Sequence, residues 1–184
     1  MLEVPRIETE RLILRGLENR DTDAFCEMMA NDEVARFITP QGKGVGRGDA
    51  WRSMATVVGH WALRGYGFFA VEEKATGQFV GRVGPWQPEG WPALECGWTI
   101  ARPYWGKGYA SEAAIAGVQW IFAQKPELTR IISVIDPGNE ASKAVARKIG
   151  ERDSGGRWEF WGETLEIWEC PREEWLERFG AQGS

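Results

Sequence analysis

The sequence is poor in histidine and cysteine, and it lacks any long hydrophobic run. With one histidine among 184 residues, a metal site built from several imidazoles is excluded, and we expect no metal. The odd number and wide spacing of Cys26, Cys96 and Cys170 exclude a disulfide framework and predict reduced thiols in the interior. No apolar stretch approaches the roughly 20 residues of a membrane span, and the first residues lack a signal-peptide core. We therefore expect a cytoplasmic protein without membrane contact.

Basic residues are outnumbered by acidic ones. Lys and Arg total 22 against 27 Asp and Glu, which gives a net charge of −5. This balance argues against the binding of nucleic acid through bulk electrostatics. The length and the 43% apolar content suit one core, so we expect a single domain over residues 1–184, as a monomer or a homodimer.

The most informative segment joins a strand pattern to a helix pattern through a short glycine loop. Apolar residues alternate over residues 94–100 and then recur at helical spacing over residues 110–122. Between them stand Gly106, Lys107 and Gly108. Glycines let backbone N–H groups approach a ligand closely, and the first helical turn adds unpaired N–H groups and the positive end of its dipole. We favour a phosphate or pyrophosphate site here over an ordinary turn.

The residues around this loop resemble a known coenzyme A site. Residues 104–113 are similar to the pyrophosphate loop of the GNAT N-acetyltransferases, and most similar to the branch that contains the RimJ/RimL-like ribosomal-protein N-terminal acetyltransferases. One departure is Pro103, which stands where the general family pattern has Gln or Arg and removes one side-chain donor. The stretch at residues 9–15 resembles the opening strand of the same branch. Residues 136–150 are similar to the family helix that carries Asn-x-x-Ser and ends in Lys-x-Gly.

The patterns along the chain agree with the fold that this resemblance implies. Both indicate an α+β fold in which helices flank a mixed, mostly antiparallel sheet, with the order β-α-α-β-β-β-α-β-α-β-β. The expected strands cover residues 8–15, 66–72, 78–84, 94–100, 130–135, 157–161 and 164–168, and the expected helices cover about 22–29, 49–64, 110–125 and 139–150, with a short one from 171.

The resemblance implies acetyl transfer from acetyl-coenzyme A to a primary amine. We expect a peptide or protein N-terminus as acceptor; the alternatives are a small-molecule amine, polyamine-like or antibiotic-like, and a non-catalytic acyl-coenzyme A binding module. A protonated amine cannot attack a thioester, so a base is required. We choose Glu95, which alternation directs away from the apolar face of its strand; a salt-bridged strand-margin glutamate is the competing interpretation. Glu163 and Glu166 are weaker candidates for the base.

The resemblance also implies which residues contact the coenzyme. Ser142 is the candidate hydrogen-bond partner of the departing thiolate. Asn139 is expected beside the pantetheine and thiol end, a position that is compatible with a second role as a helix N-cap. The expected pantetheine contacts come from the backbone of Trp98, Thr99 and Ile100. The expected pyrophosphate contacts come from Gly106, Lys107, Gly108, Tyr109 and Ala110, and Trp105 is also expected to contact the coenzyme.

Aromatic and acidic residues in the early helices and the last hairpin suggest the charge of the acceptor. Aromatic faces and carboxylates both favour a cation, so we expect a positively charged amine. The residues behind this expectation are Trp51, Trp61, Trp158, Trp161, Glu159, Glu163 and Glu166.

Overall fold

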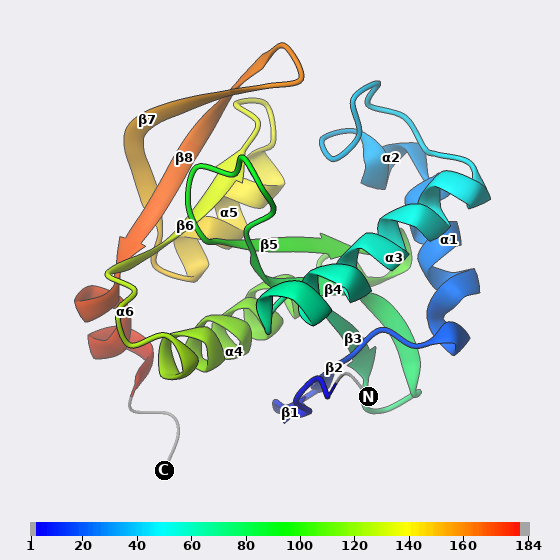
Figure 1. The fold of residues 1–184 in the computed structure, drawn as a ribbon, viewed down its shortest axis with the longest axis horizontal. Helices are drawn as coiled ribbons and strands as arrows, with labels where there is room; N and C mark the ends of the chain where they lie inside the picture. Colours follow the sequence, from blue (N-terminus) through cyan, green and yellow to red (C-terminus); the bar gives the residue numbers. More distant parts are fainter. Residues whose placement is uncertain (1–2, 181–184) are drawn as a thin grey trace.

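The computed structural model describes residues 3–180, so residues 1–2 and 181–184 of the predicted domain lie outside the described residues. A sheet of eight strands runs through the molecule, with helices packed against it (Figure 1). The strands are β1 (Ile7–Glu8), β2 (Leu12–Arg15), β3 (Phe69–Glu73), β4 (Gln78–Trp86), β5 (Glu95–Ile100), β6 (Arg130–Ile135), β7 (Arg152–Phe160) and β8 (Glu163–Pro171). The helices are α1 (Thr22–Ala30), α2 (Asp32–Ala35), α3 (Arg47–Arg64), α4 (Tyr109–Gln124), α5 (Glu140–Lys148) and α6 (Arg172–Phe179).

The sheet is mixed and mostly antiparallel, as predicted. Its spatial order is β1-β2-β3-β4-β5-β6-β8-β7. Every neighbouring pair is antiparallel except β5 and β6, which are parallel and are joined through α4. A parallel pair needs a long crossover connection, and the helix that follows the glycine loop supplies it.

Two apolar clusters hold the helices on the sheet. The larger cluster packs the apolar side of α4 against β2 to β5, and Phe69 and Val71 of β3 belong to it. The smaller cluster packs α1, α2 and the first half of α3 against Ala70 and Phe79. Because successive side chains of a strand point to opposite faces, Phe69 and Ala70 assign these two clusters to the two faces of the sheet.

The first predicted strand is wrong in form. Residues 8–15 make a hairpin, β1 and β2, in which Ile7 pairs with Leu14 and Glu8 with Ile13. The chain turns at Thr9, whose N–H donates to the Leu12 carbonyl at 2.9 Å. Leu12, Ile13 and Leu14 form the one apolar run in this segment, and no glycine or proline in the segment precedes it to mark a turn, so the pattern does not reveal two short strands.

Other boundaries differ from the predictions by a few residues. Helix α3 begins at Arg47 with Gly46 as N-cap, so Asp49 is inside the first turn and does not cap it. Strand β4 continues through Pro85 to Trp86, where its pairing with β3 has already ended and a missing N–H is tolerated. Pro171 is the N-cap of α6 and ends β8. The last hairpin is longer than predicted at its open end, because β7 begins at Arg152 and β8 ends at Pro171, and its turn lies at residues 161–162.

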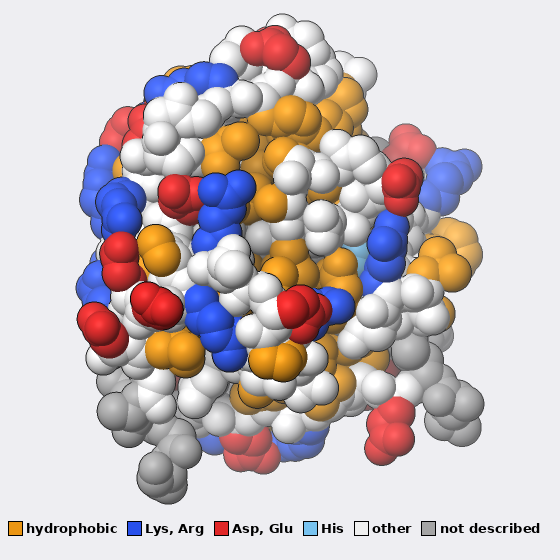
Figure 2. Space-filling view, turned by 60° about the vertical axis from the view of Figure 1, so that its left-hand side comes forward, with side chains coloured by type: hydrophobic (Ala, Val, Ile, Leu, Met, Phe, Trp, Pro, Cys, Tyr) orange, Lys and Arg blue, Asp and Glu red, His pale blue; other side chains and the backbone are white. Residues whose placement is uncertain are grey.

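The prediction of unpaired cysteines in the interior is confirmed. All three cysteines are free and buried. His60 is a packed side chain: its Nδ1 lies 2.7 Å from the Tyr66 carbonyl oxygen, and its ring stacks on Trp86. Within residues 3–180, none of the helices combines the length and apolar character of a membrane span. On the face drawn in Figure 2, acidic and basic side chains are interspersed, and hydrophobic ones gather in its upper and central parts.

Candidate active site

The two central strands separate after a single residue pair. Strands β5 and β6 pair only at Glu95 and Ile132, where the Ile132 N–H donates to the Leu94 carbonyl at 3.3 Å. The Cys96 carbonyl, which points to the same side, accepts from the Ser133 hydroxyl at 2.8 Å. By alternation the N–H and C=O of Trp98 also point toward β6, beyond the point where the ladder stops. The fork therefore leaves a strand edge of β5 beside a cavity.

One cavity lies on the glycine-loop side of this fork, and we call it the loop cavity. It has a volume of about 600 Å³, and its walls come from β5, the glycine loop with the start of α4, one side of α5, and α2 with the segment after it. All but one of the residues predicted to contact a coenzyme line it: Trp98, Thr99, Ile100, Trp105, Gly106, Gly108, Tyr109, Ala110, Asn139 and Ser142. The structure therefore gathers residues from two sequence matches around one hollow.

The glycine loop has the backbone conformation that its sequence predicts. Gly106 and Gly108 both adopt positive φ, 77° and 79°, which L-residues rarely adopt. A side chain at Gly106 would meet open space, so its glycine serves conformation or close approach and not packing. Gly108 is the N-cap of α4, a helix of 16 residues whose first N–H groups face the loop cavity.

The hairpin turn of β1 and β2 holds this loop in place. Arg11 donates to the Lys107 carbonyl at 2.8 Å and forms an ion pair with Glu112 at 2.7 Å. The Lys107 side chain turns away from the loop cavity, with its Nζ 3.4 Å from Glu73. Lys107 is the one predicted coenzyme contact that does not line the cavity, and only its backbone can serve an anion there.

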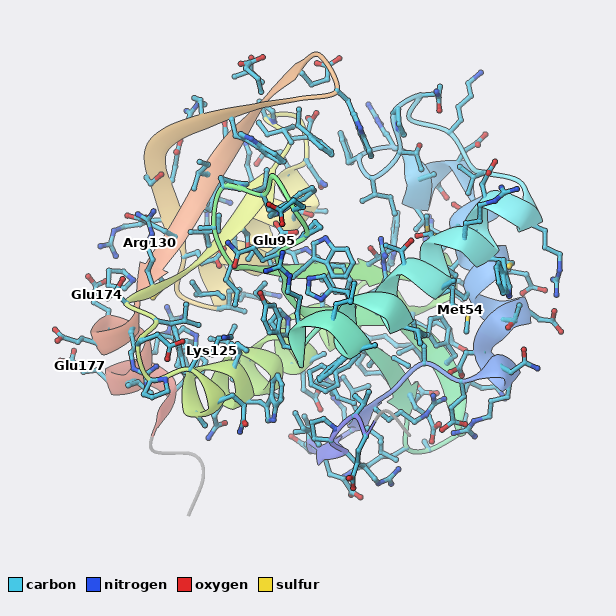
Figure 3. The ribbon with its side chains drawn as sticks, viewed as in Figure 1. Met54, Glu95, Lys125, Arg130, Glu174 and Glu177 are labelled. Carbon is cyan, nitrogen blue, oxygen red and sulfur yellow. The ribbon has the colours of Figure 1, made fainter. Side chains whose placement is uncertain are left out.

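A second cavity lies across β5, and we call it the Glu95 cavity. Its volume is about 720 Å³, and its walls include Glu95, Arg82 and the ring of Phe68. The tip of the last hairpin reaches it through Phe160 and Trp161. Figure 3 shows Glu95 near the centre of the molecule, between the β7–β8 hairpin and α3. The two cavities meet at β5, and the residues that line both are Arg36, Phe37, Ile38, Trp98, Thr99, Asn139 and Ser142.

Glu95 is buried and carries a strongly altered acidity. Its side chain is 7% exposed, and burial raises the pKa of its carboxyl to about 7. The Val134 N–H, which donates to Glu95 Oε2 at 3.2 Å, and the charge of Arg82 oppose this rise in pKa. A carboxyl with a pKa near 7 is ionised about half the time at neutral pH and is a competent base.

Ser142 and Asn139 lie at the junction of the two cavities. The Asn139 side chain accepts from the Ser142 N–H at 3.1 Å, so the N-cap interpretation is confirmed. The Ser142 hydroxyl accepts from the Trp98 indole N–H at 3.2 Å. This bond occupies a lone pair of the oxygen and leaves the hydroxyl proton available for another acceptor.

Several predicted acceptor residues do not reach the Glu95 cavity. Of the seven named, only Trp161 and Glu163 line it. Trp61 is buried in the core, and Trp158 packs against Trp91. Glu166 forms an ion pair with Lys143 at 3.2 Å. Its position removes the support for Glu166 as the base.

Sequence reasoning missed Arg82 and Tyr104. Arg82 lines the Glu95 cavity and Tyr104 lines the loop cavity. One signal for Arg82 was present, since it is the only charged residue in the otherwise apolar and glycine-rich residues 79–86. A lone charge in a strand that is buried on both faces indicates a functional position.

Comparison with known proteins decides the family. The sequence matches the acetyltransferase (GNAT) domain over residues 11–152. The chain belongs to the GNAT acetyltransferase family. This GNAT chain is 35% identical over 153 residues to the uncharacterized protein YkkB of Bacillus subtilis, which covers 79% of this chain and 84% of that protein.

Solved structures agree with this assignment. The crystal structure of the acetyltransferase from Agrobacterium tumefaciens is similar with a TM-score of 0.79 and 28% identity, covering 92% of this chain and 96% of that one. RimJ of Mycobacterium smegmatis, in complex with CoA-disulfide, is similar in fold with a TM-score of 0.69 and 21% identity, covering 98% and 94%. The predicted GNAT fold is therefore confirmed, and the enzyme is an acetyl-CoA-dependent N-acetyltransferase.

The residues of this GNAT chain fit acetyl-CoA as co-substrate. A pyrophosphate suits two positive-φ glycines at the start of a long helix, and a chain of amides suits the strand edge that the fork leaves on β5. The loop cavity joins these two features in one hollow.

Proposed function

We propose that this enzyme transfers the acetyl group directly to a primary amine that enters through the Glu95 cavity, with Glu95 as the general base. The observation that carries the proposal is the meeting of two cavities at the middle of β5, one with an anion-binding loop and one with a base. Direct transfer needs such a shared wall because the amine and the thioester must touch.

In the proposed transfer, the amine nitrogen bonds to the acetyl carbon and the carbon–sulfur bond breaks. Acetyl-CoA supplies the activated thioester. Glu95 takes a proton from the amine, directly or through a water molecule, and the thiolate departs with the bonding electron pair. Ser142 donates its free hydroxyl proton as a hydrogen bond toward that thiolate. The main-chain N–H of Trp98, on the free edge of β5, is the proposed donor to the carbonyl oxygen as negative charge develops there.

The fold and the volume of the Glu95 cavity are compatible with two acceptor classes, a peptide N-terminus and a small-molecule amine. The likeness to RimJ is a likeness of fold, because the identity is 21%. The Glu95 cavity, at about 720 Å³, is within the usual range for a small-molecule site. A single amino-terminal residue of a peptide fits a volume of this size as well.

An acceptor screen read by free-thiol release tests the proposal. Acetyl-CoA is offered with peptides, amino acids, polyamines and aminoglycoside-like amines, and the wild type is compared with the Glu95→Gln variant. We expect thiol release that depends on an amine and falls in the variant. Thiol release with none of these amines, alongside tight coenzyme binding, would support the non-catalytic acyl-CoA module instead.

A further inference from the structure

We propose that the acceptor amine belongs to a small molecule that also carries a carboxylate, and that Arg82 binds this carboxylate. The acceptor is then amino-acid-like. This inference rests on the proposed function and adds the substrate class to it.

Arg82 enters the Glu95 cavity from the middle of β4. It pairs in register with Thr99 of β5, and its guanidinium lies 4.7 Å from the ring centroid of Phe68 and 5.8 Å from that of Phe25. Its Nε is buried and has no hydrogen-bond partner among residues 3–180. Over the same residues, Arg82 takes part in none of the ion pairs. The aromatic rings therefore hold its charge without neutralising it.

Arg15 shows how this protein pairs a buried arginine elsewhere. Its guanidinium lies 2.8 Å from Asp21 and 2.9 Å from Glu72, with all three side chains buried. Burial of a charged guanidinium without such partners costs free energy. For the same reason burial lowers the pKa of Arg82 to about 10. A carboxylate in the cavity would supply the missing partner, since the planar fork of arginine matches it.

Glu95 does not fill this role. The two side chains act on each other through space, yet Glu95 Oε2 accepts from Val134 and the pair forms no salt bridge in the described part of the chain. A base must keep an oxygen free for the amine. Glu95 and Arg82 thus offer two separate positions in one cavity, one for an ammonium or amine and one for a carboxylate.

The charge of Arg82 disfavours the other acceptor classes at its end of the cavity, although Asp136 and Glu163 also line the cavity. A polyamine would bring a second cation toward a guanidinium. A peptide N-terminus would bring a neutral amide where a carboxylate pairs better. The rings of Phe68, Trp86 and Phe160 give the cavity apolar walls, which suit the side chain of an aromatic or large apolar amino acid.

A binding test that needs no turnover separates this inference from the proposed function. The probes are 3-phenylpropanoate and its neutral amide, 3-phenylpropanamide, titrated by tryptophan fluorescence because Trp86, Trp91 and Trp161 line the cavity. We expect the carboxylate to bind the wild type about tenfold or more tightly than the amide, as for a charge-assisted hydrogen-bonded pair. Equal affinities, or no binding of the carboxylate at millimolar concentration, overturn the inference.

Variants assign the effect to Arg82. Arg82→Gln is expected to abolish the preference for the carboxylate, whereas the control Arg52→Gln, on an exposed part of α3, is expected to keep it. Arg82→Lys keeps a charge between the rings but loses the planar fork, so it is expected to show an intermediate preference. The comparison of the two probes on the wild type needs no variant, so it still tests the inference if a variant fails to fold. A preference that survives in a folded Arg82→Gln protein overturns the assignment.

Turnover then identifies the acceptor. Phenylalanine, phenylalaninamide and phenethylamine present the same amine with a carboxylate, an amide or neither group. We expect phenylalanine to have the highest kcat/KM, and Arg82→Gln to lower it about 10- to 100-fold while changing that of the amide little. A wild type that prefers the amide overturns the inference and leaves the acetyl transfer intact. If the probe binds in an Arg82-dependent way but no amine is turned over, the carboxylate site is supported and the proposed function is overturned.

Discussion

The Val134 N–H donates a hydrogen bond to the Glu95 carboxylate at 3.2 Å, in the place where a regular parallel ladder would bond it to the Cys96 carbonyl. That carbonyl accepts instead from the Ser133 hydroxyl at 2.8 Å. Two side chains therefore satisfy the backbone groups at the point where β5 and β6 separate. The proposed base is thus also part of the structure that opens the sheet.

Replacement of Glu95 by glutamine should separate these two roles. The amide oxygen of Gln can still accept from Val134, so the fork should persist, but the amide cannot take a proton. We expect kcat to fall by roughly 10²-fold or more, with little change in coenzyme affinity. Steady-state thiol release and calorimetry with CoA measure the two quantities.

The matched control for this change is Glu163→Gln. Glu163 lines the same cavity from the last hairpin and is exposed. If Glu163→Gln loses turnover and Glu95→Gln keeps it, the base is Glu163 and the position of Glu95 is structural.

The acidity of Glu95 predicts the pH dependence of activity. Its pKa is raised to about 7, and the base must be ionised to act. We therefore expect kcat/KM to rise with pH through about 7 and to be lost below it, since protonated Glu95 accepts nothing. A pH profile of kcat/KM in the wild type measures this, and a flat profile between pH 6 and about 8 would exclude Glu95 as the titrating base.

The same carboxyl predicts how stability changes with pH. Because the folded-state pKa is raised from the ordinary 4.5 to about 7, the folded protein binds this proton more tightly than the unfolded chain. The resulting contribution to stability is fully present below pH 4.5 and is lost as pH rises to about 7. At pH 8 ionised Glu95 costs up to about 3 kcal/mol, so Glu95→Gln should unfold at higher urea than the wild type there. The difference should shrink at pH 5. A variant less stable than the wild type at both pH values would contradict this.

The sequence was sufficient for most of the elements and for most of the residues that line the loop cavity. The strand, glycine loop and helix around Gly106 have local causes. Alternating apolar residues predict the strand, the glycines predict positive φ, and helical periodicity predicts the helix. For the same reason the N-cap at Asn139 was readable from the spacing of Asn139 and Ser142.

What the sequence could not show depends on residues far apart in the chain. The direction of the Lys107 side chain is set by Glu73, 34 positions away. Arg82 lacks a carboxylate partner in the described part of the chain. Whether a distant carboxylate reaches an arginine cannot be read from the residues next to it in the sequence. Likewise, the fork depends on how β5 pairs with β6, and these two strands are separated in the sequence by the whole of α4.

The glycine loop offers a prediction with a close control. In Gly108→Val the residue must keep a backbone φ near +79°, which costs about 1–2 kcal/mol, and its Cβ would meet only Arg11 Nη2 at 3.5 Å, an ordinary contact. Gly77→Val imposes a similar strain at φ +69° in the β3–β4 turn, where no atom would lie within 4 Å of the added Cβ. We expect similar melting temperatures for both variants, but weaker CoA binding for Gly108→Val alone. Equal calorimetric affinities in the two folded variants would rule out the loop as the pyrophosphate site.

The last prediction concerns Ser142, whose hydroxyl has one free proton because the Trp98 indole donates to its oxygen at 3.2 Å. Ser142→Ala removes the proposed donor to the thiolate and leaves the Asn139 cap, which uses the backbone N–H. A hydrogen bond to a charged group is worth about 1.5 kcal/mol or more, so kcat should fall roughly tenfold with a nearly constant KM. Trp98→Phe keeps an aromatic side chain and the Ser142 hydroxyl but removes the indole N–H, so it should lower kcat less. If the two variants lose the same factor, Ser142 acts only by holding Trp98, and the thiolate must be stabilised by another group.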